Sequence, residues 1–72
     1  LVAERGGLAD LSALIAGAAD HLYAGGWLVL EHGASQASKV AALLVARGYT
    51  HVRCHPDLAG LPRVTEAQYD PF

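Results

Sequence analysis

Residues 25–33 read Gly-Gly-Trp-Leu-Val-Leu-Glu-His-Gly, and this stretch decides the fold of the chain. Its apolar run, residues 27–30, lies between a glycine pair and a polar turn and does not alternate with polar residues. Such a run is typical of a strand that is buried on both faces, as in a parallel sheet. It is also far too short to span a bilayer. We therefore predict a strand over residues 27–31.

Amphipathic helices are predicted on both sides of this strand. Upstream, apolar residues recur at steps of three and four over residues 9–23, and Gly25-Gly26 provides the stop. Downstream, Ser35 is predicted to cap a second helix that runs to about Arg47, with Gly48 as its stop signal. The predicted core positions are Leu8, Leu11, Leu14, Ile15, Ala18, Ala19 and Leu22 in the first helix, and Ala37, Val40, Ala41, Leu44 and Val45 in the second.

Two more strands are predicted after the second helix. Residues 49–55 alternate, and a last strand over 63–68 follows a loop at 57–62. A strand-helix-strand unit implies parallel pairing through a right-handed crossover, whereas the short loop permits an antiparallel return. The segment 66–72, which overlaps the end of the last strand, is expected to be a loose tail.

Composition restricts the classes of protein to which the chain can belong. It has 72 residues, enough for one small domain, and it is 53% hydrophobic and 17% charged, which argues against disorder. The net charge of -2 weighs against a strongly basic nucleic-acid or membrane surface. Its single cysteine, Cys54, excludes an internal disulfide. Because the chain contains no methionine, we expect it to be part of a longer polypeptide.

Two motifs carry the functional information. Residues 31–36 read Glu-His-Gly-Ala-Ser-Gln, and residues 57–64 read Asp-Leu-Ala-Gly-Leu-Pro-Arg-Val. Together with Gly7-Leu8, Gly25-Gly26 and Gly48-Tyr49, these motifs resemble, in order, the C-terminal part of the release-factor glutamine methyltransferases, the HemK/PrmC family. The resemblance extends to about residue 65.

The resemblance implies an α/β fold, the C-terminal part of a Rossmann-like class I methyltransferase sheet, with residues 1–72 as a partial domain. Residues 27–31, 51–55 and 63–68 would be strands five, six and seven, with the last strand antiparallel between the other two. It implies a cytoplasmic enzyme that uses S-adenosylmethionine to methylate the Gly-Gly-Gln glutamine of peptide-chain release factors. The family's glycine-rich cofactor turn and Asn-Pro-Pro-Tyr turn are not in this sequence, so no catalytic or cofactor-binding residue is assigned. The chain alone is expected to be inactive.

Candidate site residues lie in the two motifs. Glu31, His32, Gly33 and Gln36 are expected to border the substrate site, because ligands bind at the carboxyl ends of strands in α/β sheets. The alternative is structural, with Glu31 bonded to loop backbone and Gly33 allowing a turn. For Asp57, Gly60 and Arg63 we expect a structural loop closed by an Asp57–Arg63 ion pair; a release-factor contact is the alternative.

Metal binding is not expected. The candidate ligands are His21, His32, His51, His55 and Cys54, but Cys54 and His55 are adjacent and would point to opposite faces of a strand. We predict that Cys54 is a buried apolar thiol.

Two other functions stay open. The chain could be a non-enzymatic module that self-associates through an exposed edge of the strand at 27–31. It could also be a segment of another class I methyltransferase that acts on nucleic acid, against which the net charge weighs mildly.

Overall fold

The computed structural model describes residues 2–3 and 7–70 of the chain. The predicted order of helix, strand, helix, strand and strand is confirmed, preceded by one additional short strand. The elements are β1 (Val2–Ala3), α1 (Leu8–Ala19), β2 (Trp27–Glu31), a 3-10 turn η1 (Ala34–Gln36), α2 (Ala37–Ala46), β3 (Tyr49–Pro56) and β4 (Pro62–Tyr69).

The four strands form one sheet in the order β1-β2-β4-β3. β1 pairs with β2 in parallel, whereas β4 is antiparallel to both β2 and β3. β2 and β3 therefore run in the same direction, and the last strand lies between them, as predicted. The strand at 27–31 was expected to have an exposed edge, but β1 pairs there with Val29 and Leu30.

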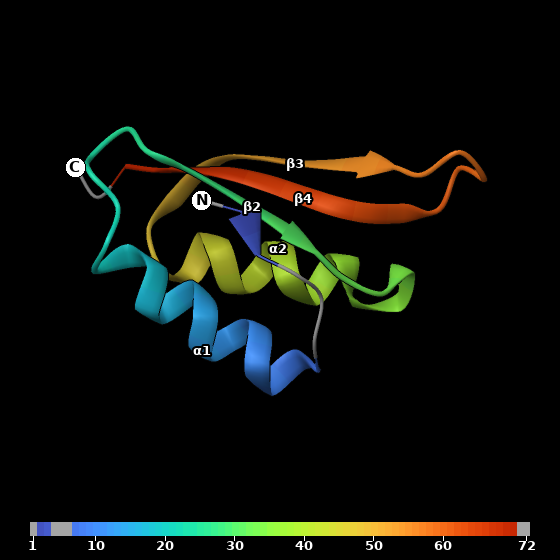
Figure 1. The fold of residues 1–72 in the computed structure, drawn as a ribbon, viewed down its shortest axis with the longest axis horizontal. Coiled ribbons are helices and arrows are strands. Elements are labelled where there is room, and N and C mark those ends of the chain that lie inside the picture. The colour runs from blue at the N-terminus through green and yellow to red at the C-terminus, as the bar shows by residue number, and fades with distance from the viewer. Residues whose placement is uncertain (1, 4–6, 71–72) are drawn as a thin grey trace.

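Both helices cover the same face of the sheet (Figure 1). Leu28 and Leu30 point into that face and are fully buried, whereas Trp27 on the opposite face is 42% exposed. The prediction that this strand is buried on both faces is therefore wrong for this structure. The run lacks polar residues, yet its burial alternates as in a sheet that has a single covered face.

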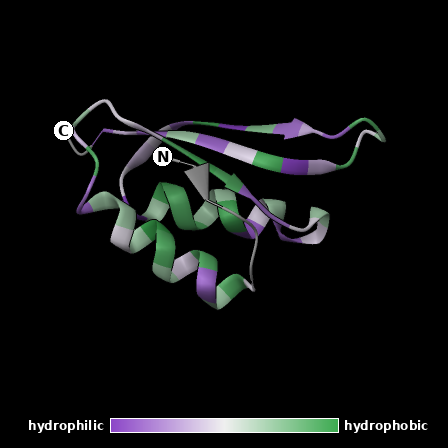
Figure 2. Cartoon of the chain, viewed as in Figure 1, coloured by the Kyte–Doolittle hydropathy of each residue, from purple (hydrophilic) through white to green (hydrophobic). Residues whose placement is uncertain are grey.

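The core lies between the helices and the sheet. Apolar residues follow the helices and β2 in Figure 2. Val45, predicted as a core position, is 64% exposed, and Leu43 packs against the core instead. Residues 43 and 45 lie on opposite sides of Leu44 around the helix, and α1 covers the side of residue 43. The buried apolar residues are Leu11, Ile15, Ala18, Leu28, Leu30, Val40, Leu44, Tyr49 and Ala67.

Two predicted boundaries differ from the structure. α1 ends at Ala19 instead of residue 23, because residues 20–26 form turns in which Gly26 N–H donates to the Tyr23 carbonyl at 2.8 Å. β4 continues to Tyr69, so residues 66–69 are not a loose tail. Ala67 is fully buried, and Tyr69 exchanges two backbone hydrogen bonds of 2.7 Å with the Gly25-Gly26 turn. Residues 71–72 lie outside the described part.

β3 is irregular and extends away from the helices. Its register with β4 shifts between Thr50 and Arg53, and His51 has a φ of 52°. The β3–β4 hairpin reaches past the helix layer (Figure 1). Cys54 is consequently exposed, and the prediction of a buried thiol is wrong.

Among the described residues, the structure contains no helix with the length and apolar character needed to cross a membrane.

Tyr49 joins β3 to α1 and should make stability pH-dependent. Its hydroxyl donates to the Ile15 carbonyl at 3.1 Å, and burial, followed by the neighbouring Tyr69, raises the pKa of the phenol above its ordinary value of 10.0. The unfolded chain therefore loses this proton first, so the free energy of unfolding should be constant below about pH 10 and decrease above it. Urea unfolding from pH 8 to 11 should show this decrease, and Tyr49→Phe should weaken it while costing about 0.5–1.5 kcal/mol at neutral pH. An unchanged alkaline profile in Tyr49→Phe would contradict this assignment.

Candidate functional site

A polar pocket of about 360 Å³ lies where β2 ends and β4 begins. It is lined by Glu31 and His32 from the first motif and by Arg63 and Val64 from the second. Glu31 and Val64 are register partners on β2 and β4, so the sheet itself brings the two motifs together. The pocket is at the carboxyl end of the parallel strands, which is the edge where α/β proteins bind ligands.

His32 is one of two buried polar residues that the structure describes at this edge. Its side chain is 1% exposed, and its backbone N–H donates to the Arg63 carbonyl at 3.0 Å. One ring nitrogen, Nδ1, lies 2.9 Å from the Gly33 carbonyl oxygen, and Nε2 lies 2.7 Å from Thr65 Oγ1. Thr65 is also 1% exposed. His32 therefore contributes to the inner wall of the pocket, whereas the exposed Glu31 lies at its rim.

The turn after β2 is closed by the side chain of Gln36. Gly33 N–H donates to Gln36 Oε1 at 2.7 Å, and Gln36 N–H donates to the Gly33 carbonyl at 2.9 Å. The spacing Gly-x-x-Gln thus satisfies backbone groups that would otherwise be left open at a helix start. Ser35, predicted as the cap, lies inside η1, and α2 has no side-chain cap bond. Gly33 and Gln36 of the first motif are therefore structural partners of each other.

The second motif forms a closed loop. The Asp57 carboxylate accepts backbone N–H groups from Ala59 at 2.9 Å and Leu61 at 3.0 Å, and it accepts Arg63 Nε at 3.2 Å. The bond from Leu61, aided by Arg63 and Ala59, lowers the pKa of Asp57 below its ordinary value. Gly60 has a φ of 82°, a conformation that strongly favours glycine. These contacts fix where Arg63 enters β4 beside the pocket.

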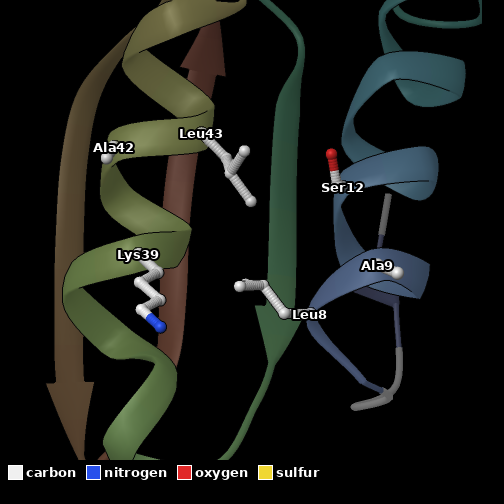
Figure 3. Close-up of a pocket in the computed structure, with 6 residues that line it drawn as sticks. All are labelled: Leu8, Ala9, Ser12, Lys39, Ala42 and Leu43. Carbon is white, nitrogen blue, oxygen red and sulfur yellow. The ribbon is translucent and has the colours of Figure 1, made fainter.

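A second, apolar pocket of about 560 Å³ lies between the two helices (Figure 3). Leu8 of α1 and Leu43 of α2 extend into the space between them, and Lys39 lies at one end. The residues that line this pocket come from the predicted apolar stripes of the helices and from their neighbours. They do not include a pair of titratable side chains. The polar pocket at the sheet edge is therefore the stronger candidate for chemistry.

Comparison with known proteins gives a consistent family. No protein-family model matches the chain. It is similar to proteins named release factor glutamine methyltransferase: 46% identical over 63 residues to that of Neisseria gonorrhoeae (88% of this chain, 23% of the relative). The protein of Pseudomonas aeruginosa is 45% identical over 69 residues (96% of this chain, 25% of the relative). That of Coxiella burnetii is 43% identical over 68 residues (94% of this chain, 24% of the relative). By sequence, the chain is related to the C-terminal segment of the release factor glutamine methyltransferases. It spans about a quarter of the length of these curated relatives.

Two glycine-containing turns flank β2, and each is bonded to groups of the chain itself. The described strand-to-helix turn of β2 is filled by its own residues, because a Cβ on Gly33 would lie 3.2 Å from Gln36 Oε1. Gly25-Gly26 forms a turn at the opposite end of β2, bonded to Tyr69. Residues 2–3 and 7–70 contain no cluster of three or more side chains that could hold a metal ion.

Of the residues that line the polar pocket, sequence reasoning placed Glu31 and His32 at a substrate border and Arg63 in a structural loop, and it did not single out Val64. Gly33 and Gln36, predicted at the same border, do not line the pocket.

Sequence reasoning also missed Thr65. Thr65 follows the second motif directly and is the hydrogen-bond partner of His32. A single threonine between Val64 and Glu66 in a predicted strand belongs to no recognisable motif, so the sequence does not predict a role for it. Its role is evident once the register places it beside Leu30, one residue from the end of β2.

Proposed function

We propose that the chain forms one wall of the substrate site of a protein-(glutamine-N5) methyltransferase. The parent enzyme would use S-adenosylmethionine to methylate the Gly-Gly-Gln glutamine of peptide-chain release factors, in the cytoplasm where these factors act. The observation that carries the proposal is that the two motifs of the family resemblance meet in one pocket, lined by Glu31, His32, Arg63 and Val64. The names of the relatives support the substrate class.

The strand order supports the same conclusion. The unit β2-α2-β3 is followed by a last strand, β4, which inserts antiparallel between β2 and β3. The C-terminal part of a Rossmann-like class I methyltransferase requires this arrangement. In such a sheet the carboxyl ends of β1 and β2 lie next to each other. The pocket would then be adjacent to the residues that hold the substrate amide in the parent protein.

Within that enzyme, this chain would bind and orient but not transfer the methyl group. Glu31 is exposed at the rim, and its carboxylate can accept hydrogen bonds from N–H groups of a protein substrate. The Asp57–Arg63 pair keeps the opposite wall in place. Glu31 and the Asp57–Arg63 pair would both position the substrate. Small displacements of a substrate change reaction rates strongly.

The test compares the 72-residue chain with the full-length polypeptide that carries it. Calorimetry should detect S-adenosylmethionine binding to the full-length protein but not to the chain, even at millimolar ligand. Transfer of labelled methyl groups to a release factor should require the full-length protein. Glu31→Gln should lower kcat/KM for the release factor by about 10–100-fold, the effect of one hydrogen bond to a charged group. Binding of the donor by the chain itself would contradict the proposal.

Self-association is a second candidate function, favoured by the short β1. β1 pairs with only Val29 and Leu30, which leaves part of the β2 edge for another strand. If this edge pairs between copies, sedimentation at increasing concentration should show dimers. A monomer at all concentrations would exclude this function. In the described part of the chain, no comparable feature favours a methyltransferase that acts on nucleic acid.

A further inference from the structure

We propose that His32 is a positioning residue of the substrate pocket, which fixes the turn beside Glu31 to β4 through Thr65. The inference rests on the proposed function, because it assigns a role within that same site. His32 does not itself contact the substrate in this assignment. Its ring is enclosed by the protein, with 1% exposure, so the exposed Glu31 is the group presented to a ligand.

The ring makes two side-chain hydrogen bonds to different parts of the chain. Nδ1 contacts the Gly33 carbonyl at 2.9 Å, within the turn, and Nε2 contacts Thr65 Oγ1 at 2.7 Å, on β4. The backbone N–H of His32 adds a third bond, 3.0 Å to the Arg63 carbonyl. The turn and β4 are therefore connected at the point where both line the pocket.

These contacts also determine where the imidazole carries its proton. A carbonyl oxygen can only accept, so Nδ1 must donate to Gly33. In the neutral ring, Nε2 is then an acceptor and Thr65 must donate its hydroxyl proton. The ring orientation is fixed by both bonds. Replacing Thr65 removes the donor and leaves Nε2 buried without this partner.

Gly33 is the part of the turn that this arrangement restrains. Its carbonyl accepts both His32 Nδ1 and the Gln36 N–H, and its own N–H donates to Gln36 Oε1. Loss of the His32 ring would free one of these contacts and the link to β4 together. The turn would keep its Gln36 bonds, so the fold would persist while Glu31 changes position relative to Arg63.

The experiment uses the full-length polypeptide with four single variants and the double variant His32→Phe/Thr65→Val. His32→Phe keeps a ring but removes both bonds, Thr65→Val removes only the hydroxyl, and His32→Gln retains an amide that can accept from Thr65. His21→Phe is the matched control, because His21 is exposed in the turn after α1. The readouts are kcat and KM for the release factor, the stoichiometry and Kd of S-adenosylmethionine, and nitrogen-15 shifts of the His32 ring.

We expect His32→Phe to lower kcat/KM for the release factor by up to about 100-fold, the effect of a displacement near 1 Å. The stoichiometry and Kd of S-adenosylmethionine should stay unchanged, because the cofactor is held elsewhere. Thr65→Val should give a similar loss and no further loss in His32→Phe, and His32→Gln should recover part of it. The nitrogen-15 shifts of the neutral ring should show the proton on Nδ1 and not on Nε2. His21→Phe should match the unmodified protein.

Three results would overturn the inference. The first is full activity of a folded His32→Phe protein. The second is a parallel loss of activity and of S-adenosylmethionine stoichiometry, which indicates unfolding and a purely structural role. The third is a proton on Nε2 with no response to Thr65→Val. If the unmodified protein transfers no methyl group to release factors, the proposed function fails, and the ring shifts still decide whether His32 is held as described.

Discussion

Leu44→Ala is expected to cost about 2–5 kcal/mol of unfolding free energy, because it removes a fully buried side chain from the centre of the helix-sheet core. A domain of this size has only a few kcal/mol of stability. Most molecules should therefore be unfolded at room temperature. Circular dichroism with urea titration would measure the loss.

Val45→Ala is the matched control, because Val45 is the next residue in α2 and is 64% exposed. Its replacement should change the unfolding free energy by less than about 0.5 kcal/mol. Equal effects of the two substitutions would mean that α2 packs with a different face toward the sheet than the structure shows.

Gly26→Ala should destabilise the chain by about 1–3 kcal/mol, through crowding in the turn that leads into β2. A Cβ at residue 26 would lie 2.9 Å from the Tyr23 carbonyl oxygen and 3.2 Å from Leu22 Cδ2. The same turn binds the end of β4, since the Tyr69 N–H donates to the Gly26 carbonyl at 2.7 Å. A shift of the backbone there would weaken the pairing of β2 and β4. Thermal unfolding would report the effect.

Gly17→Ala, the matched control in α1, should have the opposite sign. Apart from the neighbouring residues and the backbone of α1 itself, no atom lies within 4 Å of a Cβ at residue 17, and alanine is favoured over glycine in a helix by about 0.5–1 kcal/mol. A gain for Gly17→Ala and a loss for Gly26→Ala would separate helix propensity from steric crowding. If Gly26→Ala were also stabilising, the described turn would be wrong.

Local patterns predicted which elements form, but not which sheet face is covered. The apolar run at 27–30 correctly indicated a strand. Its composition could not show that both helices cover one face, because this depends on the order of the strands, including the unpredicted β1, as well as on the right-handed crossovers. The exposure of Cys54 has a similar cause. The alternating pattern predicted a strand. Whether the helices cover Cys54 depends on the register shift at His51 and on the length of the β3–β4 hairpin.

Part of the candidate site was predictable, including the Asp57–Arg63 ion pair, but its other internal contacts were not. The motifs identified Glu31, His32 and Arg63, and the end of a strand indicated the edge. That Gln36, and not Ser35, satisfies the backbone of the turn required the actual conformation of η1. Thr65 was found only from the register of β4, because a threonine in a strand usually has no special role.

Photocrosslinking at residue 31 tests the central claim most directly. A benzophenone amino acid would replace Glu31 in the full-length polypeptide, and Val45, exposed on α2, would carry it as control. The two motifs form a substrate wall in this account, so a release factor should crosslink through its Gly-Gly-Gln loop at residue 31 and not at residue 45. Crosslinking at neither position, in a protein that still methylates its substrate when unmodified, would contradict the claim that this pocket faces the substrate.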